Sequence, residues 1–224
     1  MYTVAFVEDE KDLSNLIKTY LMAAGYNVVC LTSGHEAMDY IGNKVDIWIL
    51  DIMLGDDISG YDIIKEIRKQ DEVVPVIFTS ARDQDLDKIL GLELGSDDYI
   101  TKPYSSKELV LRVNNIIKRV YKEENNNNKI IKYDIYNIDT EKRIVSKDNK
   151  EIKLTTLEFD LLLLFLNNKD KCFKREEILE AVWGTDYFGS DRVVDDLIRR
   201  LRKKLPNINI SAIYGFGYRL SWKY

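Results

Sequence analysis

The sequence predicts an α/β fold, a doubly wound parallel sheet of five strands, followed by a smaller winged helix-turn-helix domain. The first half alternates short apolar runs with helical patterns, which is typical of a parallel sheet with crossover helices. Residues 47–50 are all apolar, as expected for a strand buried on both faces. A basic amphipathic helix and a glycine-containing hairpin end the chain, whose 224 residues suit two domains.

Each predicted strand of the first half is followed by a predicted helix. The expected strands are residues 2–7, 26–31, 45–51, 75–79 and 98–101. The expected helices are an apolar pattern over 13–21, a short helix opened by a Ser33–Glu36 capping box, and helices over 61–70, 84–94 and 105–121. Gly25 and Gly95 follow two of these helices, and glycine is favoured just past a helix end.

Polar side chains stand where these strands end. Glu8 and Asp9 follow the first strand and Asp51 ends the third, while Thr79 ends the fourth and Lys102 follows the fifth. The carboxyl ends of parallel strands meet at one edge of a sheet, so we expect the five side chains to converge. Clustered carboxylates repel one another, and Mg²⁺ relieves this repulsion. Mg²⁺ and a lysine beside a carboxylate nucleophile are the parts that phosphoryl transfer needs.

The second half reads as a separate domain. Residues 123–128 contain no apolar residue and are expected to link domain 1–122 to domain 129–224. Alternating apolar residues over 129–154 predict short antiparallel strands. A capping box at Thr155–Glu158 opens a buried helix, and a second helix is expected over 176–183. The third helix runs from about 191 to 205, and 208–222 form a hairpin with Gly215 and Gly217 at its tip.

The third helix of this half is amphipathic and strongly basic. Its apolar stripe consists of Val194, Leu197, Ile198, Leu201 and Leu205, and most other positions carry Arg192, Arg199, Arg200, Arg202, Lys203 and Lys204. An amphipathic helix whose charged face is simply solvated would be enough to explain the charges. A preceding helix pair and a following hairpin favour a DNA-binding helix that enters the major groove.

Charge and composition narrow the classes of function. Residues 1–122 carry 21 acidic and 14 basic residues, whereas residues 190–224 carry 3 acidic and 8 basic ones. An acidic front half and a basic tail agree with nucleic acid binding by the tail. No apolar run is long enough to span a bilayer. The two distant cysteines, Cys30 and Cys172, and the single His35 predict neither a disulfide framework nor a zinc site, and we expect a cytoplasmic protein.

The first half resembles the receiver domain of two-component response regulators, which has a flavodoxin-like fold. The matching motifs are Val7-Glu8-Asp9-Glu10, Leu50-Asp51-Ile52-Met53-Leu54, Thr79-Ser80-Ala81 and Thr101-Lys102-Pro103. The resemblance implies that Asp51 accepts a phosphoryl group from a sensor histidine kinase. It implies Mg²⁺ held by Asp9, Asp51 and the Met53 backbone carbonyl, with Glu8 nearby through water.

The resemblance also implies a switch and a dimer. Thr79 would bond the phosphoryl oxygen, Lys102 would pair with it, and Tyr99 would swing inward when Thr79 moves. Phosphorylation would promote a homodimer through the fourth helix, fifth strand and fifth helix, and an isologous contact suits such a face. The residues at matching positions are Lys88, Leu92, Asp97, Asp98, Glu108, Val110, Arg112 and Arg119.

The second half resembles the OmpR/PhoB type of DNA-binding domain. The matching segments are Arg192-Val193-Val194-Asp195, residues 198–205 and residues 215–220. The resemblance implies promoter DNA as a partner, with RNA polymerase as a possible further one. The implied DNA-contacting residues are Arg192, Arg199, Arg200, Arg202, Lys203 and Arg219, the last on the wing.

Three departures from the family patterns matter. Gly55 replaces a common proline, and Gly60 lies nine residues after Asp51 instead of eight, so Asp56-Asp57 add charge that we hypothesise alters metal affinity or phosphoryl lifetime. Tyr214 stands where the wing commonly carries an arginine. Asp196-Leu197 replaces a common Val-His pair, and Asp196 would either accept a bond from cytosine N4 or face solvent.

Other classes of protein explain the pattern less well. A phosphatase of the haloacid dehalogenase type would need a second aspartate two residues after Asp51, where Met53 stands, so substrate turnover is not expected. A regulator that binds DNA without phosphorylation would not need Asp9, Asp51, Thr79 and Lys102. A flavodoxin-like cofactor binder would need a glycine-rich phosphate loop after the first strand, and Glu8-Asp9-Glu10 stand there.

Overall fold

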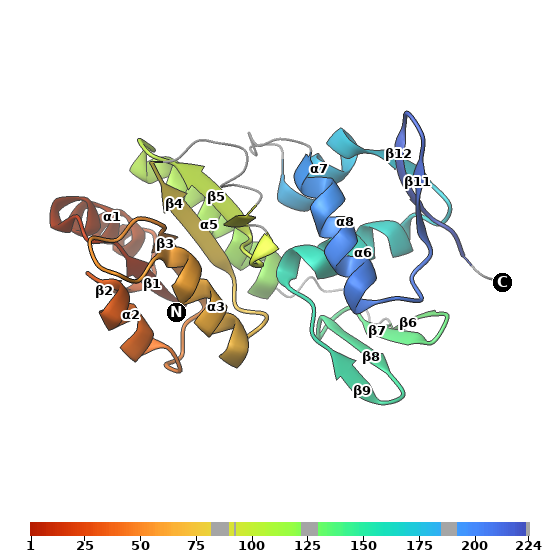
Figure 1. Ribbon diagram of the computed structural model, residues 1–224, viewed down its shortest axis with the longest axis horizontal. Coiled ribbons are helices and arrows are strands. Elements are labelled where there is room, and N and C mark those ends of the chain that lie inside the picture. The colour runs from red at the N-terminus through yellow and green to blue at the C-terminus, as the bar shows by residue number, and fades with distance from the viewer. Residues whose placement is uncertain (82–89, 92, 122–129, 185–191, 223–224) are drawn as a thin grey trace. The chain divides into compact units, whose positions relative to one another are not determined.

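The computed structural model describes residues 1–81, 90–91, 93–121, 130–184 and 192–222. The chain divides into two compact units, Met1–Lys122 and Glu123–Tyr224 (Figure 1). Each unit is described by itself. Among the described residues, no helix combines the length and apolarity that a membrane span requires.

The first unit contains the predicted parallel sheet of five strands. The strands are β1 (Thr3–Val7), β2 (Asn27–Leu31), β3 (Ile47–Asp51), β4 (Val76–Ser80) and β5 (Asp98–Thr101). The helices are α1 (Lys11–Ala23), α2 (Gly34–Tyr40), α3 (Gly60–Gln70) and α5 (Ser106–Tyr121). All pairs are parallel and the strand order is β2-β1-β3-β4-β5, which confirms the expected fold class. The helix expected over 84–94 lies mostly outside the described residues.

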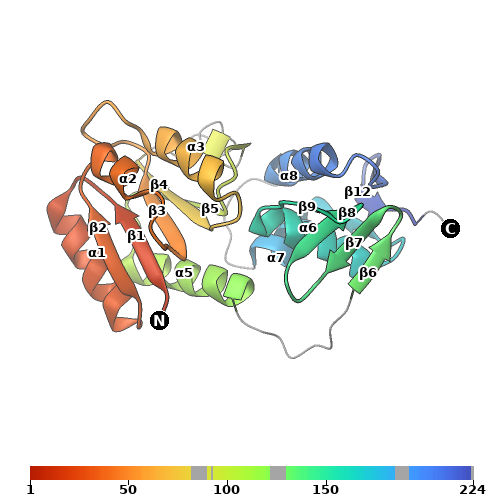
Figure 2. The same ribbon diagram turned by 90° about the horizontal axis from the view of Figure 1, so that it is seen from below.

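Helices cover both faces of this sheet (Figure 2). Ile47 and Ile49 of β3 pack with α1 and α5, including Ile17 and Val113, on one face. Trp48 of β3 joins a second cluster with α2 and α3 on the other face. Because alternate side chains of a strand point to opposite faces, a strand covered twice must be apolar at every position. This explains the unbroken apolar run that ends in Asp51.

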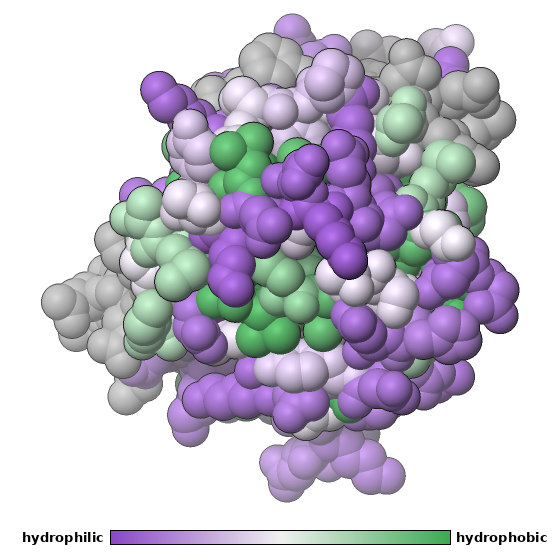
Figure 3. Space-filling view, turned by 90° about the vertical axis from the view of Figure 1, so that its left-hand side faces the viewer, coloured by the Kyte–Doolittle hydropathy of each residue, from purple (hydrophilic) through white to green (hydrophobic). Residues whose placement is uncertain are grey.

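The outer face of α1 exposes apolar side chains. Ile17 and Leu21 are buried against the sheet, whereas Leu16, Tyr20 and Met22 are exposed. Figure 3 views the molecule from the side on which α1 lies and shows hydrophobic patches within a mostly hydrophilic surface. The exposed apolar side chains therefore lie on the helix that directly follows Glu8, Asp9 and Glu10 in the sequence.

The described residues of the second unit form two antiparallel sheets and three helices. The four-stranded sheet contains β6 (Ile130–Tyr133), β7 (Tyr136–Asp139), β8 (Ile144–Lys147) and β9 (Lys150–Ile152). The helices are α6 (Thr156–Asn167), α7 (Arg175–Trp183) and α8 (Arg192–Lys204). The second sheet contains β10 (Cys172–Lys174), β11 (Ile210–Ile213) and β12 (Gly217–Leu220), in the order β10-β12-β11.

The predicted hairpin is the β11–β12 pair, and its third strand was not expected. Gly215 has a φ of 70° in the turn, a conformation that favours glycine. At Gly217 an added Cβ would lie 2.0 Å from the Phe173 carbonyl oxygen. Glycine therefore allows β12 to approach β10 closely. The β10 strand has only three residues, too few for an alternation pattern to reveal it.

Candidate functional site

Three carboxylates meet at the carboxyl ends of β1 and β3. These strands are neighbours, with Val7 paired to Leu50, so the residues that follow them share one edge. Ligand oxygens of Glu8, Asp9 and Asp51 all lie within 4.8 Å of one another. Glu8 and Asp51 are buried, and Asp9 is exposed. The strand order reverses between β1 and β3, which is where open α/β sheets place their sites.

Lys102 from the end of β5 reaches across to two of these carboxylates. Its Nζ donates to Asp51 Oδ2 at 2.6 Å and to Glu8 Oε2 and Oε1 at 2.7 and 2.9 Å. Burial raises the pKa of the Glu8 carboxyl, and the charge of Asp51 adds to this rise against the effect of Lys102. Burial opposes the charged form of Lys102, but hydrogen bonds to Asp51 and Glu8 hold its pKa above the ordinary value.

The donor set fits a hard divalent cation. Among the described residues, one ammonium faces three carboxylates, so the cluster keeps an excess of negative charge. Mg²⁺ prefers oxygen ligands and binds through one or two carboxylates while it keeps waters. The Met53 amide donates to Asp51 Oδ1 at 3.0 Å, which brings the backbone of Met53 beside the carboxylates.

Thr79 lies beside Asp51 because β3 pairs with β4 and these two residues are partners in the pairing. The Thr79 hydroxyl is buried and, apart from the Tyr104 hydroxyl, has no hydrogen-bond partner within the described part of the chain. Tyr104, which sequence reasoning missed, brings a second buried hydroxyl close to Thr79. Burial raises the pKa of Tyr104, and the charge of Glu8 raises it further. Tyr99 is also buried, against the α2 and α3 face of the sheet.

The loop after Asp51 is attached to α2. Asp56 Oδ2 accepts from the Gly34 amide at 2.7 Å, and Asp57 Oδ1 lies 2.9 Å from His35 Nε2. The hydrogen bond to His35 lowers the pKa of Asp57. A Cβ on Gly34 would lie 2.5 Å from the Ile58 Cβ, so this contact depends on glycine. The two acidic residues of the longer loop therefore bind the start of α2.

Side chains expected at a dimer face make contacts within the unit. Asp97 is buried, and its Oδ2 accepts from the Val76 amide at 2.9 Å. Asp98 pairs with Arg112 at 2.9 Å, and Arg112 also pairs with Glu108 at 2.8 Å. Val110 and Arg119 are half-buried on α5, and the expected residues Lys88 and Leu92 lie outside the described residues. Asp97 thus faces inward, and the β5–α5 charges are already paired.

Some basic side chains of helix α8 are exposed to solvent, and others form ion pairs or hydrogen bonds within the second unit. Arg192, Arg199 and Lys203 are exposed, although Arg199 donates to Asp196. Arg200 is nearly buried; it lies 3.3 Å from Asp196 and 3.9 Å from Glu158.

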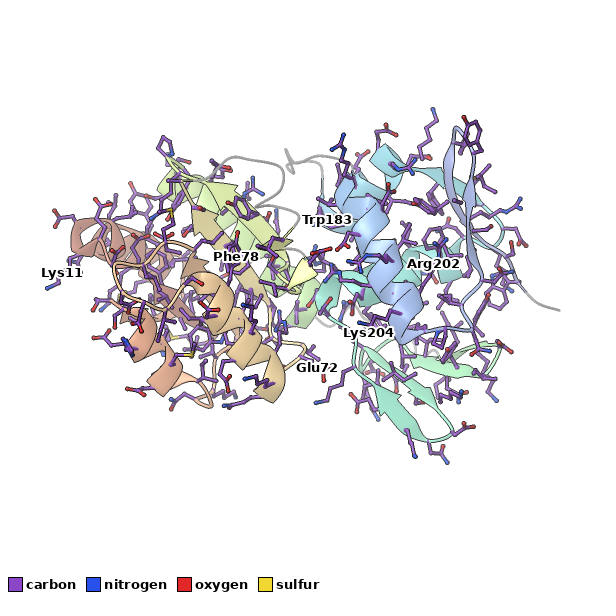
Figure 4. The ribbon with its side chains drawn as sticks, viewed as in Figure 1. Lys11, Glu72, Phe78, Trp183, Arg202 and Lys204 are labelled. Carbon is purple, nitrogen blue, oxygen red and sulfur yellow. The ribbon has the colours of Figure 1, made fainter. Side chains whose placement is uncertain are left out.

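Two further basic side chains of the predicted set lie toward the wing. Arg202 donates to the Ile210 carbonyl at 2.6 and 3.1 Å and points toward the wing sheet (Figure 4). Arg219 is half-buried on β12. Arg200 and Arg202 therefore stabilise the fold whether or not they also contact DNA, and Asp196 is paired with arginines instead of facing solvent alone.

Glu158 ties α8 to the start of α6. Its Oε2 accepts from the Thr155 amide at 2.9 Å, as the predicted capping box requires, and from Lys204 Nζ at 2.9 Å. On the other side of α8, Asp195 accepts from Arg175 at 2.8 Å and from the Tyr218 hydroxyl at 2.8 Å. These contacts fix α8 against α6, α7 and β12.

The first unit is a parallel sheet with an acidic edge and a lysine, and the second is a winged helix-turn-helix unit. Together they define a protein with a receiver domain and a DNA-binding domain. Comparison with known proteins agrees. Residues 4–114 match the response regulator receiver domain family, and residues 149–220 match the family described as "Transcriptional regulatory protein, C terminal".

Two relatives match over nearly the whole chain. The transcriptional regulatory protein CssR of Bacillus subtilis is 50% identical over 98% of both chains. The response regulator SaeR of Staphylococcus aureus is 35% identical, again over 98% of both chains. Among solved structures, DrrB of Thermotoga maritima, an OmpR/PhoB homologue, is 30% identical with a TM-score of 0.54 over 99% of both chains. A RitR mutant shares the fold with a TM-score of 0.73 at 22% identity.

The chain belongs to the OmpR/PhoB family of two-component response regulators. It is a transcriptional regulator with a receiver domain and a DNA-binding domain. Membership implies a sensor kinase as partner and DNA binding through the C-terminal domain.

Proposed function

We propose that Asp51 is the phosphoacceptor of this regulator and takes its phosphoryl group from a sensor histidine kinase. The observation that carries the proposal is the position of Asp51: it ends β3, with Lys102 Nζ 2.6 Å from Oδ2 and with Glu8 and Asp9 beside it. Asp57, which pairs with His35 and is exposed, has no such surroundings. Lys102 then neutralises charge on the phosphoryl group as well as on Asp51.

Asp9, Asp51 and the Met53 backbone carbonyl would hold Mg²⁺, with Glu8 nearby through water. When bound, the ion neutralises the negative charge of the transferring phosphoryl group. The chain's own residues orient the acceptor: the Met53 amide holds Asp51 Oδ1, and Lys102 holds Oδ2. We expect acceptance and slow loss of the phosphoryl group, without turnover of a substrate.

Phosphorylation would act through Thr79 and Tyr99 on the β5–α5 surface. Thr79 would donate a hydrogen bond to the phosphoryl group, and Tyr99, which is already buried in this structure, would be held in that inward position. An isologous dimer would then require Asp98, Glu108 and Arg112 to exchange some of their internal ion pairs for pairs across the interface. Exposed ion pairs are each worth only about 0–1 kcal/mol, so apolar contacts must contribute too.

Promoter DNA is the proposed target of the second domain. We assign α8 to the major groove and the β11–β12 hairpin to the wing, with the exposed Arg192, Arg199 and Lys203 as the leading contacts. The domain limits are proposed as 1–122 and 129–224, joined by the linker 123–128. Because the kinase reaction and the DNA meet in the cytoplasm, we place the regulator there, and RNA polymerase is a further proposed partner.

Phosphoryl incorporation tests the proposal directly. Wild-type protein incubated with acetyl phosphate and Mg²⁺ is expected to gain one phosphoryl group by intact mass, whereas Asp51→Asn gains none. Asp57→Asn is the matched control, because it removes an exposed aspartate of the same loop, and it is expected to behave like wild type. Incorporation in Asp51→Asn, or none in wild type, contradicts the assignment.

Two further measurements address the output. Sedimentation with and without beryllofluoride is expected to show a monomer and a dimer, and an unchanged monomer counts against the dimer. Selection of bound sequences from a random DNA pool is expected to yield tandem half-sites only after activation. Equal selection without activation would favour a regulator that binds DNA independently of phosphorylation.

A further inference from the structure

Tyr104, which the sequence analysis did not single out, places a hydroxyl near the acidic site from the segment after β5. It follows Lys102 and Pro103 at the end of β5, and its ring packs against the hydrophobic cluster on the α1 and α5 face of the sheet. Its hydroxyl lies at the other end of the ring, beside Thr79 and under the influence of Glu8 and Asp51. The apolar packing of the ring therefore fixes where the hydroxyl stands.

The hydroxyls of Thr79 and Tyr104 share an unusual property. Both oxygens are buried, the two hydroxyls interact with each other, and neither has another hydrogen-bond partner among the described residues. A buried polar group without a partner is costly, so such groups usually have a reason to be kept. Each hydroxyl can donate one hydrogen bond and accept others. A pair of hydroxyls with no partner beyond each other can be satisfied together if a strong acceptor arrives next to one of them.

Resting on the proposed phosphorylation of Asp51, we propose that Tyr104 is a positioning residue of the phosphoryl site. The phosphoryl group is the arriving acceptor. Thr79 donates a hydrogen bond from its hydroxyl to a phosphoryl oxygen, and a lone pair of the Thr79 oxygen accepts a hydrogen bond from the Tyr104 hydroxyl. The chain Tyr104 to Thr79 to phosphoryl satisfies both buried hydroxyls at once and holds Thr79 in the phosphorylated arrangement.

The surroundings of Tyr104 support its role as a donor. Burial raises the pKa of Tyr104, and the nearby carboxylates Glu8 and Asp51 raise it further, so its hydroxyl keeps the proton that it donates in a hydrogen bond. Lys102 bridges Glu8 and Asp51 in this structure. Hydrogen bonds arranged in a chain polarise one another, so a donor behind Thr79 strengthens the bond that Thr79 makes in front.

Tyr104→Phe tests the inference, since it removes the hydroxyl and keeps the ring. Affinity for beryllofluoride in the presence of Mg²⁺ is read from the fluorescence of Trp48, which is buried on β3 three residues before Asp51. Loss of one hydrogen bond is expected to weaken this affinity roughly twofold to tenfold, and to shorten the lifetime of phosphorylated Asp51 to a similar extent. Tyr26→Phe is the matched control, because Tyr26 packs in the same cluster but bonds Asn114.

A double variant separates positioning from packing. In a Thr79→Ala background, Tyr104→Phe is expected to have no further effect, because the chain is already broken. Wild-type affinity in Tyr104→Phe, or an equal loss in both backgrounds, overturns the inference. Failure of the proposed function looks different: wild type itself then binds no beryllofluoride and gains no phosphoryl group.

Discussion

Replacement of Lys102 by methionine would expose the electrostatic balance of the acidic site. The side chain keeps its approximate volume, but the ammonium that bridges Asp51 and Glu8 is lost. Two buried carboxylates then face each other without a cation. We expect the Lys102→Met receiver domain to be less stable than wild type in EDTA, and we expect Mg²⁺ to recover much of the loss.

The structure limits the size of this effect. The repulsion cannot cost more than protonation of Glu8, which is the carboxyl already biased toward its neutral form. Protonation costs about 1.4 kcal/mol for each pH unit above the ordinary pKa of 4.5, hence about 3.4 kcal/mol at pH 7 and about 1.4 kcal/mol at pH 5.5. The sign follows: a carboxyl whose pKa is raised on folding destabilises the fold increasingly as pH rises above 4.5.

Urea unfolding at pH 5.5 and pH 7, each with EDTA or with Mg²⁺, measures these quantities. The difference between wild type and Lys102→Met is expected to grow from pH 5.5 to pH 7 in EDTA and to shrink with Mg²⁺, since a ligand that binds only the folded state stabilises it. Lys107→Met, an exposed lysine of α5, is the control. A difference that is independent of both pH and Mg²⁺ would refute the electrostatic reasoning.

Three other substitutions test how the scaffold holds its two sites. In Gly60→Ala the methyl would lie 2.4 Å from the Asp51 carbonyl oxygen, so we expect a loss of about 1–3 kcal/mol in unfolding free energy and reduced phosphoryl incorporation. Asp62→Asn weakens the capping box with Ser59 and is expected to cost about 1 kcal/mol at pH 7. The hydrogen bond to Ser59 lowers the Asp62 pKa, so this cost should disappear as pH falls below 3.8. Glu158→Gln removes the carboxylate that anchors α8 and is expected to cost about 1–3 kcal/mol in the second domain and to weaken DNA binding.

Matched controls exist for each of these substitutions. Lys11→Ala changes the exposed first residue of another helix, and Asp12→Asn removes an exposed acid of the first turn of α1. Glu151→Gln removes an exposed glutamate of β9. Each control is expected to change the unfolding free energy by less than about 0.5 kcal/mol. A test variant that matches its control would show that the contact in question carries no stability.

The convergence of the acidic site could be predicted because it depends on backbone topology alone. Parallel strands end at one edge whatever their side chains, so Glu8, Asp51 and Lys102 had to approach one another once the strands were recognised. The apolar run before Asp51 was similarly informative, because only a strand covered on both faces requires it.

The choice of partner for each charged side chain could not be predicted. Asp97 and Arg200 carry charges that suit a surface, yet Asp97 accepts from a buried amide and Arg200 lies between two acids. The pairing depends on the angles between elements distant in the chain, which no local pattern encodes. Tyr104 escaped notice for the same reason: a tyrosine after Lys102-Pro103 reads as core, and only the fold aims its hydroxyl at Thr79.

The longer loop after Asp51 shows how acidic side chains expected at one site can be held by hydrogen bonds at another. The sequence predicts that Asp56 and Asp57 add negative charge near the metal site, but Asp56 accepts from the Gly34 amide and Asp57 pairs with His35. The loop should therefore influence Mg²⁺ affinity through its shape, because it carries the Met53 carbonyl. Asp57→Asn keeps the loop length and is expected to leave Mg²⁺ affinity unchanged, whereas deletion of Asp57 is expected to change it equally at low and high salt. An effect of Asp57→Asn that fades with salt would restore the charge explanation, since salt screens exposed charges.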